Sequence, residues 1–221
     1  MRNFVSRIEG QRVIVHPWLT RRWMVLFLMS TSCISSLGGD GASRRRGITP
    51  EDETILSITL GKSTAEDVTR TLGVAPARET SLDHEISTSC YLGKDGTVLE
   101  FSYWVGEPIE FRLAIAPDEG SARCADSALV SRELATASGL KLGLSKQQVI
   151  RKMGSPSRKS AGRYVYAVTI ERPPTAEETS RFKTKGGPPW EVETIQITQK
   201  IEIVFRKTKV VSIRVVHSET I

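Results

Sequence analysis

The chain has 221 residues and a formal net charge of +6 at pH 7. That length has room for two small domains, each large enough for a modest core. Residues 1–46 contain eight of the 31 basic residues and two of the 25 acidic ones, which leaves 23 of each sign from residue 47 onward. The part of the chain expected to fold is therefore electrically balanced and lacks the basic footprint of a nucleic-acid-binding protein. We expect no nucleic-acid partner.

Residues 1–32 carry the three parts of a secretory signal. Arg21 and Arg22 precede the apolar run 23–29, and small residues follow it. The run is too short to span a bilayer as a helix, which takes about 20 residues. The small residues end at Cys33, which resembles the lipobox cysteine that is acylated in bacterial lipoproteins. The alternatives are cleavage nearby without lipid and a buried N-terminal helix.

The cysteine count fits the same compartment. Residues 33–50 form a Gly- and Ser-containing linker, and lipid on Cys33 would leave Cys90 and Cys124 as the two other cysteines. In an oxidising compartment such a pair is expected to form a disulfide. Two unconnected buried thiols are the alternative.

One sequence pattern occurs twice, at 60–76 and at 142–156. Each copy has Leu-Gly, a Ser or Thr, apolar residues at helical spacing and a closing Gly before a Pro. Ser and Thr favour helix starts and Gly favours helix ends, so each copy predicts a short helix. The closing residues Gly73 and Gly154 lie 154 − 73 = 81 residues apart, the length of a small domain. The predicted inward faces are Ala65, Val68 and Leu72 in the first helix and Val149, Ile150 and Met153 in the second.

Strands are predicted after the first helix. Residues 86–92 favour a strand, and the Asp-Gly pair within 93–96 favours a hairpin turn. The next run, 98–104, alternates between apolar residues on one face and mixed residues on the other, and 109–115 alternates again. Such alternation predicts one covered and one solvent-exposed face. Trp104 falls on the exposed face, where we expect it to anchor a protein partner.

The second half follows the same plan with one insertion. Strands are predicted at 164–170, 194–206 and 210–217, and residues 171–193 form a long connection. A connection of that length is usually either functional or disordered. It contains a capping-box sequence from Thr175 to Glu178 and ends with Trp190 behind two prolines. Trp190 is predicted either to bind a partner or to fold back onto the sheet edge.

These motifs are similar to those of a known family. The order Gly, Ser/Thr, Val and Leu-Gly-x-Pro, followed by strands ending with Phe205, Val210 and Ile213, resembles the SmpA/OmlA (BamE-like) lipoproteins of the bacterial envelope. Two such units in one chain resemble the tandem architecture of β-lactamase inhibitory proteins. The resemblance covers residues 58–78 and 139–217, and it implies protein–protein binding without catalysis. No binding residue of the family is matched in this sequence.

Catalytic motifs are incomplete. Gly61-Lys62-Ser63 lacks the earlier glycine of a nucleotide-binding P-loop, because position 56 is Leu56. The cluster at 83–85 contains His84, but adjacent residues on an extended chain point to opposite faces and cannot converge on a metal. A nucleophilic pairing of His84 with Cys90 or Cys124 requires a free thiol, which a disulfide removes. The sequence predicts no catalytic residue, cofactor, metal or nucleotide.

Together these features predict an α+β protein with two tandem repeats, 51–125 and 126–221, after the leader and linker. Each repeat would pack one or two short helices on an antiparallel β-meander. The predicted function is a non-catalytic protein-binding module of the cell envelope, of the outer-membrane assembly or maintenance type. Lipid would hold it at the periplasmic face of a membrane. The alternative is a soluble, secreted enzyme inhibitor.

Overall fold

A computed structural model describes residues 46–76, 78–79, 86–115, 124–176, 178–180 and 194–220, all within one compact unit, residues 41–221. The predicted leader 1–32, the lipidation site Cys33, most of the linker, His84 and Trp190 lie outside the described residues.

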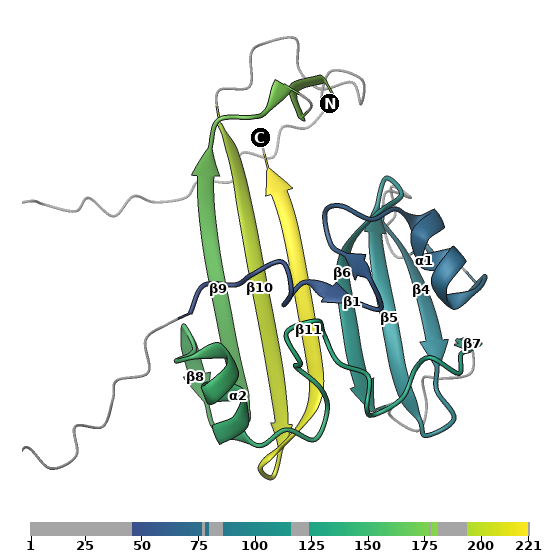
Figure 1. The fold of residues 1–221 in the computed structure, drawn as a ribbon, viewed down its shortest axis with the longest axis vertical. Helices are drawn as coiled ribbons and strands as arrows, with labels where there is room; N and C mark the ends of the chain where they lie inside the picture. Colours follow the sequence, from purple (N-terminus) through teal and green to yellow (C-terminus); the bar gives the residue numbers. More distant parts are fainter. Residues whose placement is uncertain are drawn as a thin grey trace, which may run out of the picture. The chain divides into compact units, whose positions relative to one another are not determined.

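One antiparallel sheet dominates the described part of the chain (Figure 1). It has nine strands, in the order β3-β4-β5-β6-β11-β10-β9-β8, with the short β7 parallel to β4. A separate two-stranded ribbon consists of β1 (Thr54–Ile55) and β2 (Ile58–Thr59). The sheet strands are β3 (Arg78–Glu79), β4 (Ile86–Leu92), β5 (Thr97–Trp104), β6 (Glu107–Ile115), β7 (Ala125–Asp126), β8 (Arg158–Ser160), β9 (Arg163–Arg172), β10 (Ile195–Arg206) and β11 (Lys209–Thr220).

The strand predictions hold with small changes at the ends. β4 has the predicted bounds, whereas β9 continues to Arg172 and β11 to Thr220. β9 ends just before Pro173 and Pro174, which have no backbone N–H to donate to a neighbouring strand. In β5 the burial alternates residue by residue from Thr97 to Trp104, as predicted. The sheet therefore has one covered face and one exposed face.

Two helices have closely similar ends. α1 (Ala65–Leu72) starts at Thr64 and α2 (Lys146–Met153) starts at Ser145, each with a complete capping box. Each helix also ends at a glycine whose carbonyl accepts a hydrogen bond from a tyrosine hydroxyl of the sheet. The bonds are Tyr91 Oη to Gly73 O at 3.0 Å and Tyr166 Oη to Gly154 O at 3.1 Å.

The core lies between the sheet and the segments that cover one of its faces. The predicted inward residues Val68, Leu72, Val149 and Met153 are buried in it, and Ala65 and Ile150 pack against it partly buried. Residues 46–64 cross the same face (Figure 1) and bury Ile55, Ile58 and Leu60 there. Burying apolar area at roughly 25 cal/mol per Å² is the main favourable term in such a layered fold.

Cys90 and Cys124 form a disulfide, as predicted. The two cysteines are 34 residues apart in sequence, and the bond ties β4 to the segment that leads into β7. The described chain is thus a mixed α+β-like fold with mostly β structure. The division into repeats at residues 125 and 126 stays a prediction.

Candidate binding face and polar pocket

The uncovered face of the sheet carries a shallow charged groove of about 420 Å³. Both α1 and α2 pack into the core on the opposite face. Strands β4, β5, β6, β11, β10 and β9 all contribute to the groove, which we call the outer groove. Its lining residues are Thr88, Glu100, Ser102, Glu110, Arg112, Arg163, Glu202, Val204, Ser212 and Arg214.

The centre of the outer groove is a row of four charged residues across four neighbouring strands. Register pairs Glu100 with Arg112, Arg112 with Arg214, and Arg214 with Glu202. Two arginines therefore stand directly opposite each other in the middle of the row. Like charges in that position destabilise a sheet, so this arrangement has no evident benefit for folding.

Ion pairs hold these arginines without using all their donors. Arg214 donates to both carboxylate oxygens of Glu110, at 2.6 and 2.7 Å, whereas Arg112 lies a loose 3.7 Å from Glu100. The Arg112 and Arg214 side chains are 49% and 48% exposed, and that of Glu110 is 17% exposed. The guanidinium groups are therefore more accessible than the carboxylate that supports Arg214. An arginine has several N–H groups in a rigid fork, so both keep donors for another anion.

An apolar pair lies next to the outer groove. Register places Ile86 opposite Trp104, two residues along from the groove pair Thr88 and Ser102. The two residues are 36% and 39% exposed, which is large for apolar residues in a folded chain. Trp104 thus faces outward as expected, and its role in partner binding stays a prediction.

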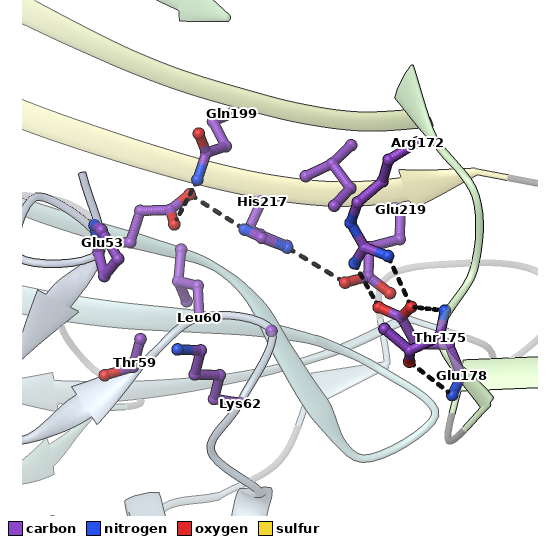
Figure 2. Close-up of a pocket in the computed structure, with 13 residues that line it drawn as sticks. Glu53, Thr59, Leu60, Lys62, Arg172, Thr175, Glu178, Gln199, His217 and Glu219 are labelled. Carbon is purple, nitrogen blue, oxygen red and sulfur yellow. Dashed lines mark hydrogen bonds and ion pairs between the residues drawn. The ribbon is translucent and has the colours of Figure 1, made fainter. Parts of the chain in front are cut away.

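The covered face has a second hollow, a polar pocket of about 460 Å³ (Figure 2). One wall comes from the loop segment that carries β1 and β2, and the other from the upper ends of β9, β10 and β11 (Figures 1 and 2). Its lining residues are Pro50, Glu53, Thr59, Leu60, Gly61, Lys62, Arg172, Thr175, Glu178, Ile197, Gln199, His217 and Glu219.

A histidine between two carboxylates forms the back of the polar pocket (Figure 2). His217 Nδ1 lies 3.1 Å from Glu53 Oε1, and His217 Nε2 lies 3.4 Å from Glu219 Oε1. Gln199 donates its amide N–H to the other oxygen of Glu53 at 2.7 Å. Glu53 is buried and His217 is partly buried, with side chains 4% and 13% exposed. A buried charge needs such partners, because an isolated one is costly to remove from water.

The surroundings of His217 determine its charge. Burial alone lowers the pKa of His217, but its hydrogen bonds to Glu219 and Glu53 outweigh this effect and raise the pKa to about 9. The ring is therefore an imidazolium at neutral pH, and both ring nitrogens donate.

Gly61 brings the loop against the histidine ring. A Cβ atom at this position would stand 2.7 Å from His217 Nε2, closer than real Cβ contacts allow. Gly61 also has a φ of +69°, a backbone conformation that glycine adopts at low cost. The glycine of the first sequence pattern therefore serves both the turn and the contact with His217.

A second charged pair borders the pocket. Arg172 donates to both oxygens of Glu178, at 2.7 and 2.5 Å, and Glu178 also accepts from the backbone N–H of Thr175. The hydrogen bond from Arg172 is the main cause that lowers the pKa of Glu178 to about 2. The predicted capping box is confirmed, since Glu178 N–H donates back to Thr175 Oγ1. This pair is neutral overall.

Lys62 completes the charges of the pocket. It lies on the loop wall, across from the strands that carry Gln199 and His217 (Figure 2). Within the described residues its ammonium group makes no ion pair, in contrast to Arg172 and His217. The loop wall therefore places a lysine across the pocket from Gln199 and His217.

Sequence reasoning did not find the polar pocket. Gln199, His217 and Glu219 occupy positions in β10 and β11 that continue the inward apolar series of Ile201 and Val215. The sequence signal that could have revealed the pocket is this change from apolar to polar side chains among the inward positions of the two strands. Glu53 offered none, because its contact with His217 joins residues 164 apart in sequence.

Among the described residues, no group of three or more His, Cys, Asp or Glu side chains is arranged so that it could hold a metal ion, and no helix is long and apolar enough to cross a membrane. The disulfide leaves neither Cys90 nor Cys124 as a free thiol. Cys33, His84 and Trp190 belong to the parts of the chain that the structure does not describe.

The fold is thus a mixed α+β class with a charged face and a polar pocket. No protein-family model matches the chain, and no curated protein matches it. Among solved structures, it is similar to the crystal structure of a "putative beta-lactamase inhibitor protein" from Streptococcus mutans. The match covers 72% of this chain and 82% of that chain, with 11% sequence identity and a TM-score of 0.24. So low a TM-score carries no argument, and membership of the SmpA/OmlA family stays an expectation.

Proposed function

We propose that this protein is a non-catalytic binding module that docks an acidic protein surface onto its outer groove. The observation that carries the proposal is the pair of arginines, Arg112 and Arg214, directly opposite each other at the centre of that groove. Two adjacent guanidinium groups together offer a planar, multidentate site for carboxylates.

The neighbourhood of the arginine pair favours a protein over a nucleic acid. Glu100, Glu110 and Glu202 line the same groove, and their charges would repel a continuous phosphate backbone. A protein surface with separate carboxylates can reach the arginines and leave the glutamates to its own basic or neutral groups. Beside the groove, Trp104 and Ile86 supply the exposed apolar contact that commonly anchors a protein interface.

The compartment is part of the same proposal. The leader pattern supports export, and the Cys90–Cys124 disulfide is typical of proteins in oxidising compartments. We propose that the protein lies in the cell envelope, anchored by lipid on Cys33. The intact mass of the mature protein from its own host tests the anchor. An N-terminus at Cys33 with added acyl mass supports it, whereas cleavage without acyl mass favours the secreted inhibitor instead.

Site-specific photo-crosslinking in the host tests the docking surface. A photoreactive amino acid at Ser102, inside the outer groove, is expected to give one discrete protein adduct that disappears in the double variant R112E/R214E. Mass spectrometry of the adduct should identify a protein whose cross-linked peptide lies in an acidic surface region. An adduct sensitive to nuclease, or one unaffected by R112E/R214E, would overturn the proposal.

The matched control uses a second pair of cations. Arg206 and Lys209 also stand opposite each other, on β10 and β11, but outside the outer groove. The variant R206E/K209E changes the net charge by the same amount as R112E/R214E. It should leave the adduct intact if the groove itself, and not the overall charge, binds the partner.

A further inference from the structure

The end of β9 is an open edge of the large sheet (Figure 1). On the side away from β10, β8 pairs with β9 only as far as Val165, and among the described strands none lies beside residues 168–172 there. The segment after β9 leads to the polar pocket on the side of β10 and β11, and so away from this edge. Thr169, Ile170 and Glu171 are exposed, Ile170 by 44%. An edge of this kind can pair with another strand.

Strand geometry shows which backbone groups of this edge point outward. Ser157 Oγ accepts from the N–H of Ala167 at 3.2 Å and donates to its C=O at 3.4 Å, on the side of β8. The backbone groups of a strand point alternately to its two neighbours, so those of Thr169 and Glu171 point to the same side as those of Ala167. Within the described residues, these outward N–H and C=O groups of Thr169 and Glu171 have no hydrogen-bond partner. The edge thus offers two donors and two acceptors.

The same edge is closed at both ends. At one end, Ser157 already engages the outward groups of Ala167. At the other end, Pro173 has no N–H, and its C=O accepts from Arg172 Nη1 at 3.2 Å. The free groups therefore lie on the two residues that flank Ile170, and the closed positions lie at equal distances beyond them. The pattern is symmetric about Ile170.

A second copy of the same segment fits this pattern. In an antiparallel pair with Ile170 opposite Ile170, Thr169 of each copy stands opposite Glu171 of the other. The residues of a hydrogen-bonded pair exchange both bonds, so the free groups of the two copies would form four backbone hydrogen bonds. Ala167 then faces Pro173 of the other copy, where neither strand has free groups to offer. Every free group meets a free group, and every closed position meets a closed one.

The neighbouring registers fit less well. Only residues with outward backbone groups can form hydrogen-bonded pairs, so the nearest symmetric alternatives are centred on Thr169 or on Glu171. The first places Glu171 opposite Ala167, whose groups are already engaged. The second places two Glu171 side chains directly opposite each other, where like charges destabilise a sheet. The register centred on Ile170 avoids both faults.

Side chains and charges support the same register. Opposite side chains approach most closely in a non-hydrogen-bonded pair, so the two exposed Ile170 side chains would shield each other from water. β8 places the exposed Arg158 and Lys159 beside the start of β9, whereas Glu171 lies near its end. Antiparallel pairing brings Glu171 of each copy toward the basic β8 of the other. The chain from residue 47 onward has equal numbers of basic and acidic residues, so two copies have no net charge to keep them apart.

We propose that two copies of this protein form a symmetric dimer by antiparallel pairing of their β9 edges, centred on Ile170. The two large sheets then become one continuous sheet. The paired edge is short compared with the about 800 Å² that each partner buries in a standard interface, so the dimer should dissociate on dilution. This inference concerns the edge of the sheet and is independent of the docking function of the outer groove.

Cysteine cross-linking of the full mature protein tests the dimer. In I170C the two Cα atoms would lie about 4.5 Å apart, within the range of a disulfide. Mild oxidation should convert I170C into a covalent dimer that a reductant separates, in a yield that falls on dilution. Ile115 is 39% exposed at the end of β6, so I115C is the matched control and should stay monomeric. The original protein, oxidised beside them, measures any link through Cys33.

Variants at position 169 test the register and the backbone hydrogen bonds. T169C should cross-link far less than I170C, because Thr169 faces Glu171 of the other copy. Combined with I170C, T169P removes an outward N–H that the fold does not use, and should slow cross-linking at least about tenfold, whereas T169V keeps the N–H and should not. Circular dichroism checks that each variant folds.

Four outcomes would overturn the proposal. I170C may form no more dimer than I115C, or T169C may cross-link as well as I170C. T169P may fold correctly and leave the cross-linking rate unchanged. In cross-linking within the host, a different protein as the main adduct of I170C would assign the edge to another partner.

Discussion

The regions around α1 and α2 have the same local structure, but the residues that surround them differ. Both helices have a capping box and a closing glycine that accepts a tyrosine hydroxyl. In both regions a glycine before the helix donates its N–H to a strand, from Gly61 to Pro108 and from Gly143 to Val210. However, a Cβ at Gly61 would meet His217, whereas a Cβ at Gly143 would meet nothing within 4 Å. Similar motifs thus place similar helices, and only one of them borders the polar pocket.

The disulfide is the largest expected difference between the two regions, because it lies only on the side of α1, where Cys90 precedes Tyr91 in β4. The variant C90A/C124A should lower the free energy of unfolding by about 3–4 kcal/mol, on the chain-entropy model for a loop of this length. Urea unfolding measures the change. A reductant should have a similar effect on the original protein and none on the variant. A loss below about 1 kcal/mol would contradict the prediction that the disulfide stabilises the fold on the α1 side.

The pH dependence of stability is the next effect, and it comes from His217. The ring has a pKa of about 9 in the folded state and about 6.5 when unfolded. Between these values the folded state binds the extra proton, so stability should fall as pH rises. The contribution is fully present below about pH 6.5 and is lost as pH passes about 9. At about 1.4 kcal/mol per pKa unit, the loss is on the order of 3 kcal/mol.

Urea unfolding at a series of pH values checks this prediction, with H217Q as the comparison. The measurement should stay below pH 10. Burial raises the pKa values of Tyr103 and Tyr166 from about 10 to about 12, so above pH 10 these two tyrosines also make stability depend on pH. The original protein should lose stability across the window while H217Q stays nearly flat. Parallel curves for the two proteins would show that His217 is not held as an imidazolium.

The sequence predicts the helices and most strands because their signals are local. Thr64 and Ser145 cap helices through residues three positions away, and the alternation in β5 needs only its own residues. The disulfide followed from the cysteine count together with the expected compartment. The polar pocket depends on contacts such as Glu53 with His217, whose partners are 164 residues apart in sequence. Likewise, the arginine pair of the outer groove follows from the pairing of β6 with β11, which no local pattern specifies.

Gly61 and Gly143 differ in what an added methyl group would contact. Both have positive φ, at +69° and +79°, so an alanine at either position is strained by about 1–2 kcal/mol. At Gly61 the added methyl group must also displace the His217 ring, which disturbs its hydrogen bonds to Glu53 and Glu219. We therefore expect G61A to cost about 1 kcal/mol or more beyond G143A in urea unfolding.

The pH dependence of G61A and G143A distinguishes backbone strain, which both variants have, from displacement of the His217 ring, which only G61A should cause. G143A should keep the fall in stability between about pH 6.5 and 9, because a methyl group at Gly143 would meet no atom within 4 Å. G61A should flatten that fall, since a displaced ring loses the carboxylates that raise its pKa. Equal destabilisation by the two variants, with the pH dependence unchanged in both, would mean that the His217 ring moves aside at no cost. In that case Gly61 would be only a turn residue like Gly143, and the pocket would not depend on the close contact between the loop and β11.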